Sequence, residues 1–492
     1  MPAHVDVLIV GAGISGIGMA HYLAADQPGR TFAVVDSRNA IGGTWDLFRY
    51  PGIRSDSDLH TFGYEFKPWT SDNAIADAHE ILSYLHEVIE EDDLARHIHL
   101  GYHVSAADWS SAEQHWTISL QRSTDGETVE LTSSFLFCAS GYYDYDSGYT
   151  PEFPGSADFG GTIVHPQHWP EDLDYTGKNV VVIGSGATAV TLIPAMADQV
   201  AHITMLQRSP SYVLSIPRQD PIANGLRKVL PAKLAYRITR FFNIRRQQLI
   251  YYLAQHHPTR VRKVIRNLVA RALPEGYDVD THFNPKYNPW DQRLCMVPDG
   301  DLFRAIGSGK ASVVTDRIET FTENGIRLAS GTELDADIIV TATGLQIRLL
   351  GGMTLRVDGE PVAVNERLVY KSMMLSGVPN FAFLVGYTNI SWTLKVDVVA
   401  SHLTRLLAHM DRHGYAVVTP VNDDAAIETS PLLDFQAGYV QRAADALPRR
   451  GSRGPWTVQY YALDQKRLAG PVEDTALQFT RARAALPAGT PA

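Results

Sequence analysis

The sequence predicts an α/β fold of two nested domains, each built on a parallel sheet, with a helical segment inserted into the inner domain. Two observations predict the sheets: a β-branched strand, a glycine-rich turn and a helical stretch follow one another from Val5 and again from Val180. A third predicts the insertion, because residues 211–287 combine helical periodicity with many Lys and Arg. A chain of 492 residues is also too long for a single core.

The N-terminal unit has the order of a dinucleotide-binding Rossmann motif. Residues 5–10 are typical of a buried parallel strand, Gly11, Gly13 and Gly16 follow in GAGISG, and the next strand ends in Asp36. Such glycines let the backbone approach a pyrophosphate that sits on the helix N-terminus, and the acid binds a ribose hydroxyl. We therefore expect an ADP-ribose site here; the alternative is a turn without a ligand.

The same pattern returns in NVVVIGSGATA. Gly184 and Gly186 form the turn, Ala187 and Thr188 begin the helix, and Ala189 takes the place of the third glycine, which the motif allows. The chain therefore has two predicted dinucleotide sites.

The residues after the following strand distinguish the two sites. In the second site, Arg208 and Ser209 stand where a carboxylate would bind a 2′-hydroxyl. An Arg pairs with a 2′-phosphate, so we expect NADPH there and FAD in the first site. The alternative is that Arg208 is a solvated surface charge.

Two further strand-and-glycine segments, at 135–141 and 337–344, suggest where the chain leaves and re-enters the outer domain. We expect an FAD-binding domain of residues 1–142 and 345–492, and an NADPH-binding domain of residues 143–210 and 288–344. Residues 211–287 form the helical insertion, and the stretch after Pro471 is expected to be helical until the chain frays.

Composition excludes several classes of protein. A net charge of -11 argues against nucleic acid as the main partner, and no apolar run is long enough for a membrane span. Cys138 and Cys295 form no CxxC motif, which argues against a disulfide framework and fits a reducing cytoplasm. His165 and His168 lack a set of further ligands, so no metal site is expected.

Two longer motifs are more specific than either glycine turn. The segment FGGTIVHPQHWP lies between the two nucleotide units, and GGTWDLFRYPGIRSD follows Asp36. Together they resemble the fingerprint and a second signature of the type I Baeyer–Villiger monooxygenases, and the branch with the ethionamide-activating enzymes is the most similar. The residues of the first motif that match are Phe159, Gly161, His165, Trp169 and Pro170.

The resemblance implies an activity. NADPH would reduce FAD, molecular oxygen would form a C4a-peroxyflavin, and this would convert a ketone to an ester or lactone or oxidise a sulfide or thioamide. It assigns charge stabilisation to Arg293 and the orientation of that Arg to Asp56. Many relatives have a Lys before this Arg, whereas this chain has Gln292, so preference for NADPH would depend on Arg208 and Ser209. An interdomain salt bridge is the alternative role for Arg293.

Other motif residues are assigned to the flavin or the domain interface. Gly43, Thr44, Trp45 and Asp46 are expected to line the flavin. Tyr50 is expected beside the cofactor and Trp392 in the wall of the substrate pocket, and for both the alternative is a place in the plain core. The segment FGGTIVHPQHWP, which we call the linker motif, would stabilise the domain interface through its His and Trp while the domains move during the reaction. The alternative is that these side chains only fill the interface.

The insertion has the composition of a basic amphipathic helix interleaved with aromatic residues. In the resembled family such an insertion covers the active site, and we hypothesise in addition a weak peripheral contact with anionic lipid. The alternative is that the insertion is a lid packed on the rest of the protein, with its charged side chains in water.

Three other functions are alternatives. A flavin monooxygenase restricted to S- or N-oxygenation would form no ester from a ketone. A flavin disulfide reductase would need a redox Cys pair, and a non-catalytic NADPH sensor would leave Asp56 and Arg293 without a role. The pattern does not decide the oligomeric state.

Overall fold

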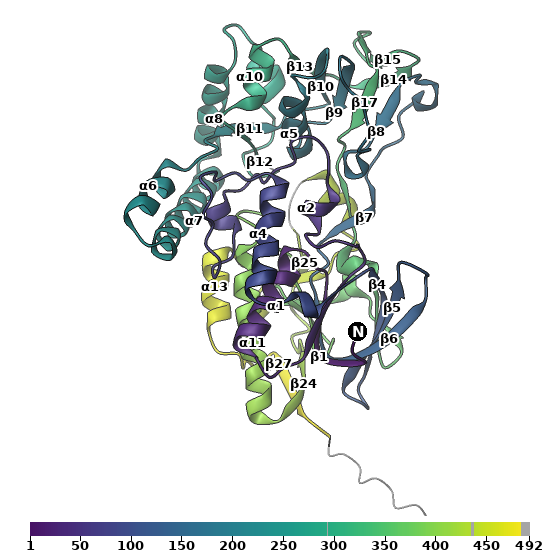
Figure 1. Cartoon of the computed structure of the whole chain (residues 1–492), viewed down its shortest axis with the longest axis vertical. Helices are drawn as coiled ribbons and strands as arrows, with labels where there is room; N and C mark the ends of the chain where they lie inside the picture. Colours follow the sequence, from purple (N-terminus) through teal and green to yellow (C-terminus); the bar gives the residue numbers. More distant parts are fainter. Residues whose placement is uncertain (293, 434–436, 484–492) are drawn as a thin grey trace, which may run out of the picture.

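The computed structural model describes residues 1–292, 294–433 and 437–483, and it contains two α/β units, one above the other in Figure 1. The outer unit is built on a sheet of nine described strands in the order β20-β19-β4-β5-β6-β1-β2-β3, with β23 beside β6. The strands β3, β2, β1, β6 and β23 are parallel, whereas β4 and β5 form an antiparallel extension. The bounds are β1 His4–Val10, β2 Phe32–Asp36, β3 Ile98–Leu100, β4 Tyr102–Ser110, β5 His115–Arg122, β6 Thr128–Cys138, β19 Thr354–Val357, β20 Glu360–Pro361 and β23 Phe381–Phe383.

The inner unit has an entirely parallel sheet in the order β13-β10-β9-β17-β8 among the described strands. It lies above the outer sheet in Figure 1. Because both faces of such a sheet must be covered, the central strands β9 and β17 consist mostly of Val and Ile. The bounds are β8 Thr162–Val164, β9 Asn179–Ile183, β10 His202–Gln207, β13 Ala311–Thr315 and β17 Ile338–Thr341.

Helices cover these sheets and also form a projection. The outer unit carries α1 Ile14–Asp26, α2 Thr44–Leu47, α3 Leu59–Phe62, α4 Ala78–Glu91, α11 Leu394–His413, α12 Gly438–Ala443 and α13 Tyr461–Ala469, and the inner unit carries α5 Ala187–Met196 and α10 Asp301–Gly307. The insertion consists of α6 Pro221–Val229, α7 Ala232–His256, α8 Pro258–Ala272 and α9 Val279–Phe283. Helices α6 and α7 project to one side in Figure 1, whereas α8 and α9 pack on the core of the inner unit. None of the helices within the described ranges combines the length and the apolarity needed to cross a bilayer.

The two passages of the chain between the units lie side by side. Strand β7 (Tyr143–Gly148) leads into the inner unit, β18 (Leu345–Ile347) leads back, and the two pair as an antiparallel ladder. The chain therefore crosses between the units through this two-stranded ladder, which we call the joint.

The α/β class with two dinucleotide-type units and a helical insertion is confirmed, but two local expectations are wrong. The segment expected to be helical from residue 211 begins with a strand, β11 (Tyr212–Ile216), which pairs in parallel with β12 (Leu294–Pro298). The tail expected to be helical contains β27 (Leu477–Arg481), which pairs with β24 (Tyr415–Pro420). Both strands form by pairing with segments at least 57 residues away in the sequence, so tertiary contacts override the local pattern.

Small ladders complete the structure. They are β14 Ile318–Thr322, β15 Gly325–Leu328 and β16 Glu333–Asp335, then β21 Val369–Tyr370 with β22 Met374–Leu375, and β25 Thr429–Pro431 with β26 Arg449–Gly451.

Candidate active site

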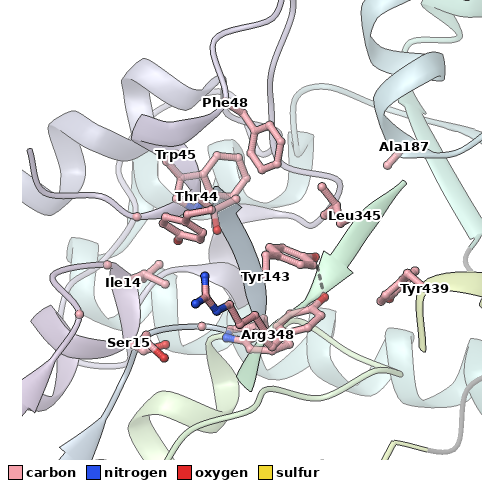
Figure 2. A pocket seen from close by; sticks show the side chains of 18 of the residues that line it. Ile14, Ser15, Thr44, Trp45, Phe48, Tyr143, Ala187, Leu345, Arg348 and Tyr439 are labelled. Atoms are coloured by element: carbon pink, nitrogen blue, oxygen red, sulfur yellow. Dashed lines mark hydrogen bonds between the residues drawn. The ribbon is translucent and has the colours of Figure 1, made fainter. Parts of the chain in front are cut away.

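A cavity of about 560 Å³ lies where the two units face each other. Its wall includes Gly11 and Gly13 of the first glycine turn and Gly186, Ala187 and Thr188 of the second. Figure 2 shows Ile14 and Ser15 on one side and Ala187 on the other. The two predicted dinucleotide motifs, whose corresponding residues Gly13 and Gly186 are 173 positions apart, therefore open into one space.

The first turn requires glycine for steric reasons. Gly11 has a φ of +111°, and a Cβ there would lie 2.6 Å from the carbonyl oxygen of Ala139. A Cβ at Gly16 would lie 1.8 Å from the carbonyl oxygen of Gly11. The chain thus turns tightly between β1 and α1 and directs the N-terminus of α1 toward the cavity, where backbone N–H groups and the helix dipole favour a phosphate.

Asp36 lies beside this turn at the end of β2. One carboxylate oxygen accepts a hydrogen bond from the backbone N–H of Ala12 at 2.7 Å, and the other accepts one from the N–H of Arg38 at 2.9 Å. Burial raises the pKa of Asp36, while these hydrogen bonds act in the opposite direction. Asp36 also lines the cavity, in the position that the Rossmann motif gives to the ribose-binding acid.

The segment after Asp36 packs directly on the first turn. A Cβ at Gly43 would lie 3.2 Å from the Cα of Gly13, and the next two residues, Thr44 and Trp45, line the cavity (Figure 2). Asp46 does not belong to the cavity wall: its buried carboxylate accepts hydrogen bonds from Arg38 and, at 2.8 Å, from Arg49. Through these two bonds Asp46 joins the short helix α2 to the segments on either side of it, at the edge of the cavity.

The same segment reaches the inner unit. The buried Tyr50 shares a side-chain hydrogen bond with Thr188 at the start of α5, and burial raises its pKa well above the usual range. A Cβ at Gly52 would lie 2.6 Å from the Cβ of Ala195 on the same helix. Asp56 lines the cavity and accepts a hydrogen bond from the Ser57 hydroxyl at 3.4 Å. The second signature therefore bridges the two units.

In the second turn, Gly184 has a φ of +136°, and a Cβ there would lie 2.3 Å from the carbonyl oxygen of Ala342. Arg208 and Ser209 directly follow β10, are exposed, and are not part of the cavity wall. The Ser185 hydroxyl, inside the turn, donates to the carbonyl oxygen of Ser209 at 3.3 Å. The backbone at Ser209 is thereby held at the edge of the turn.

Arg293, the expected charge stabiliser, lies outside the described residues. Its neighbours Gln292 and Cys295 both line the cavity, on the wall that also contains Met296.

The linker motif does not line the cavity but packs against the joint and the inner sheet. Phe159 makes an edge-to-face contact with Phe321 at 6.3 Å, and a Cβ at Gly161 would lie 2.3 Å from the carbonyl oxygen of Asp337. Trp169 contacts Tyr175 edge-on at 6.4 Å. The carbonyl oxygen of Pro170 accepts a hydrogen bond from Leu173 at 3.4 Å.

His165 is the linker residue that touches both strands of the joint. Its Nε2 lies 3.3 Å from the carbonyl oxygen of Gly344, just before β18. A Cβ at Gly148, the last residue of β7, would lie 1.9 Å from the imidazole ring. Burial lowers the pKa of His165, which favours the neutral ring at this interface.

Trp392, which was expected, lines the wall and stacks on Tyr142 with 4.8 Å between the ring centres. Tyr142 and several other wall residues were not predicted from the sequence. Arg348 brings a cation to the same wall and pairs with Asp146 at 2.7 Å (Figure 2). The sequence signal for Tyr142 was its place directly after a strand-and-glycine segment; no local signal pointed to Arg348. Further missed wall residues are Phe48, Tyr143, Leu345 and Tyr439.

One group of potential metal ligands lies away from the cavity. His409 and His413 of α11 approach Glu473, and Nε2 of His409 lies 3.0 Å from the Glu473 carboxylate. We interpret these residues as a polar contact that joins α11 to the segment before β27.

Comparison with known proteins gives the family. The model of the "pyridine nucleotide-disulphide oxidoreductase" family matches residues 8–221. The chain is 53% identical over 484 residues to the FAD-containing monooxygenase EthA of Mycobacterium tuberculosis (strain ATCC 25618 / H37Rv), covering 98% of this chain and 99% of the relative. It is 49% identical over 485 residues to a probable FAD-binding monooxygenase, AlmA, of Acinetobacter baylyi, covering 98% and 97%.

Solved structures share the fold at lower identity. An oxidised steroid monooxygenase bound to NADP matches with a TM-score of 0.78 at 21% identity, covering 97% of this chain and 100% of that one. A cyclohexanone monooxygenase from Rhodococcus sp. Phi1 bound to NADP+ matches with a TM-score of 0.73 at 21% identity, covering 98% and 100%. The relatives similar over the full length decide the assignment: the chain belongs to the EthA-type FAD-containing monooxygenases.

Proposed function

We propose that the protein is an FAD-dependent, NADPH-consuming Baeyer–Villiger monooxygenase that converts ketones to esters or lactones and also oxidises sulfides and thioamides. The observation that carries this proposal is the single cavity walled by both glycine turns and by Asp56 of the signature between them. A flavin and a nicotinamide bound at the two turns would meet there. The flavin, when bound, supplies the reaction of oxygen with the organic substrate.

The residues present fit the flavin dinucleotide. The turn at Gly11 and Gly16 leaves no room for a side chain, and the N-terminus of α1 faces the cavity beside Asp36. We assign the pyrophosphate to these amides and the ribose to Asp36. Thr44 and Trp45 would then flank the flavin ring and, with the wall at Trp392, exclude water from it.

We assign the 2′-phosphate of NADPH to Arg208 and Ser209, which lie at the edge of the second turn. Arg208→Ala is expected to lower kcat/KM for NADPH relative to NADH by on the order of tenfold, because one charge-assisted hydrogen-bond partner is lost. Steady-state kinetics with both nucleotides measures this ratio. Arg317→Ala, an exposed Arg after β13, is the matched control, and an equal ratio in the two variants would refute the assignment.

Arg293 and Asp56 are proposed as the charge-stabilising pair. A guanidinium stays protonated at neutral pH and can stabilise the negative oxygen that develops on the substrate, while the Asp56 carboxylate would orient it. Asp56 lies in the cavity wall, and so do Gln292 and Cys295 on either side of Arg293.

A product assay tests the proposed reaction. Purified yellow protein should consume NADPH in air faster when a linear methyl ketone is added, and gas chromatography should detect the ester. Arg293→Ala is expected to lower ester formation on the order of a hundredfold, because a charge stabiliser of the transition state is removed. Arg317→Ala should retain it. Sulfoxide from a sulfide without ester from any ketone would favour the alternative, a flavin monooxygenase restricted to S- or N-oxygenation.

We further propose that the linker motif couples domain motion to the reaction. His165 contacts the backbone beside both strands of the joint, so rotation of one unit against the other must change its surroundings. Such motion would let the nicotinamide reduce the flavin first and make room for substrate afterwards.

A further inference from the structure

Exposed apolar side chains are concentrated on one part of the molecule. Of the sixteen large apolar residues that are exposed within the described ranges, eleven lie between residues 222 and 268 and three between 458 and 463. We call these fourteen residues the insertion surface; they lie on α6, α7 and α8 and in residues 458–463, at and just before the start of α13. Its members are Ile222, Val229, Leu234, Phe241, Phe242, Leu249, Ile250, Tyr252, Leu253, Val264, Leu268, Val458, Tyr460 and Leu463.

The same region is strongly basic. Residues 221–274 contain twelve Lys and Arg and no Asp or Glu, in a protein of net charge -11. Three of these cations are paired, Arg227 with Asp72, Arg240 with Asp397, and Arg266 with Asp280. Eight others are exposed: Lys228, Lys233, Arg237, Arg245, Arg246, Arg260, Lys263 and Arg271.

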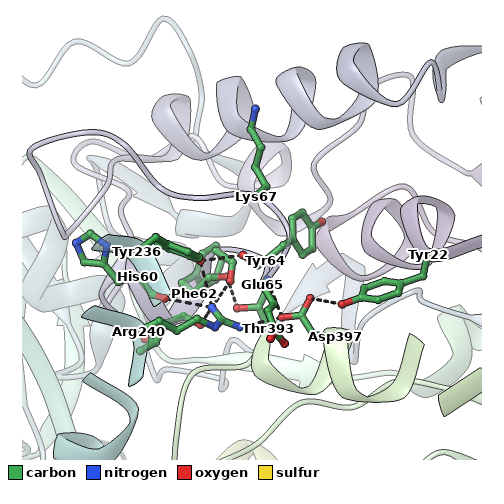
Figure 3. A network of polar contacts seen from close by, with 12 residues as sticks. Tyr22, His60, Phe62, Tyr64, Glu65, Lys67, Tyr236, Arg240, Thr393 and Asp397 are labelled. Atoms are coloured by element: carbon green, nitrogen blue, oxygen red, sulfur yellow. Dashed lines mark hydrogen bonds and ion pairs between the residues drawn. The ribbon is translucent and has the colours of Figure 1, made fainter. Parts of the chain in front are cut away.

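One face of α7 is bound to the outer unit, so the opposite face of the helix is directed to solvent. Arg240 is buried and donates to the carboxylate of Asp397 at 2.8 Å and to the carbonyl oxygen of Gly63 at 2.6 Å (Figure 3). Tyr236, one turn earlier, donates to the carbonyl oxygen of Tyr64 at 2.8 Å. Because one face of α7 is held by the outer unit, Phe241 and Phe242 cannot turn inward to escape water.

A groove of about 460 Å³ runs between α7 and α13 at this surface. Leu234 and both phenylalanines line it, and Arg237 and Arg245 bring cations to the same wall. The guanidinium of Arg245 lies 5.3 Å from the centre of the Phe241 ring. The apolar side chains of the groove can contact the acyl chain of a lipid, and the neighbouring guanidinium groups can pair with the phosphate of its headgroup.

We propose that the insertion surface docks on anionic lipid bilayers, with its apolar side chains in the acyl region and its exposed cations at the lipid phosphates. An isologous contact with a second copy would bring the unneutralised cations of both chains together, at an electrostatic cost. A nucleic acid would engage the cations and leave the aliphatic side chains in water. The inference does not depend on the proposed reaction, since binding can be measured without turnover.

The groove also gives docking a structural connection to the active site. Ile244 and Tyr461 line the groove and pack in one cluster with Tyr387 and Ile390, which line the cavity between the units. One layer of side chains therefore separates the lipid-facing groove from the cavity.

Vesicle co-sedimentation of the flavin-loaded protein tests the proposal. The protein should sediment with vesicles of mixed phosphatidylglycerol and phosphatidylcholine and remain in solution with phosphatidylcholine alone. The double variants Phe241→Ser/Phe242→Ser and Arg245→Glu/Arg246→Glu should each lower the partition coefficient on the order of tenfold or more. Lys178→Glu/Arg317→Glu reverses two exposed cations on the inner unit and should bind as the wild type does.

Two readouts keep the result interpretable. Flavin content and thermal unfolding identify any variant that has lost its fold, and sedimentation velocity without lipid reports self-association. Absence of binding at every phosphatidylglycerol fraction would overturn the proposal. So would an equal loss in the Lys178/Arg317 control, which would indicate general charge attraction, or a dimer that Phe241→Ser/Phe242→Ser dissociates, which would make the surface a contact between copies.

Discussion

Gly16→Ala is expected to yield a protein that purifies without flavin and has no monooxygenase activity. A methyl group at this position would lie 1.8 Å from the carbonyl oxygen of Gly11, so α1 and the turn must move apart. That movement takes the N-terminal amides of α1 away from the pyrophosphate, and a site that depends on close backbone approach cannot compensate. The ratio of flavin to protein absorbance after purification measures the loss.

Gly29→Ala is the matched control, because a Cβ at that position meets no atom within 4 Å. It should retain full flavin content. Circular dichroism separates loss of the cofactor from loss of the fold. If Gly16→Ala and Gly29→Ala bound equal amounts of flavin, the turn at Gly11 would not be the flavin site.

Arg240→Ala is expected to lower the free energy of unfolding by about 3–5 kcal/mol. Arg240 and Asp397 are both buried, and removing the guanidinium leaves the Asp397 carboxylate in the interior without its cation (Figure 3). The remaining donors to that carboxylate, the Tyr22 hydroxyl at 3.3 Å and the N–H of Glu65 at 3.0 Å, carry no charge. Chemical denaturation monitored by fluorescence gives the difference.

Arg245→Ala, an exposed Arg on the same helix, should change stability by less than about 0.5 kcal/mol. Replacing both partners, as in Arg240→Leu/Asp397→Leu, should recover part of the loss, because no unpaired charge remains. An Arg240→Ala protein as stable as Arg245→Ala would mean that the pair does not anchor α7.

At Gly16 the carbonyl oxygen that excludes a side chain belongs to Gly11 of the same turn, whereas at Gly11 and Gly184 it belongs to the distant residues Ala139 and Ala342. The glycine turns could nevertheless be predicted, because strand, turn and helix follow one another within one short stretch of sequence. Asp36 was predictable for the same reason. The rest of the cavity wall is assembled from distant segments: Tyr142 precedes the joint, Arg348 follows it, and no local pattern joins them.

The linker motif is an intermediate case. Its place between the units followed from the order of the motifs, but that His165 lies against Gly148 and Gly344 depends on how β7 and β18 pair. The strand β27 marks the limit of local reasoning. Its residues satisfy their hydrogen bonds on β24, about 60 residues earlier, and this partner is not visible in the segment itself.

The joint of β7 and β18 has a consequence for how such a chain can be divided. Because the two strands run side by side, the ends of the inner unit meet in space, at Tyr149 and Gly344, where the N–H of Tyr149 donates to the carbonyl oxygen of Gly344 at 3.0 Å. A segment whose ends meet can be spliced into a loop of another protein without disturbing the host. The inner unit therefore has the end-to-end geometry of an inserted domain, and an exchange between relatives would also have to keep its contacts with the outer unit, such as the pair of Arg240 with Asp397.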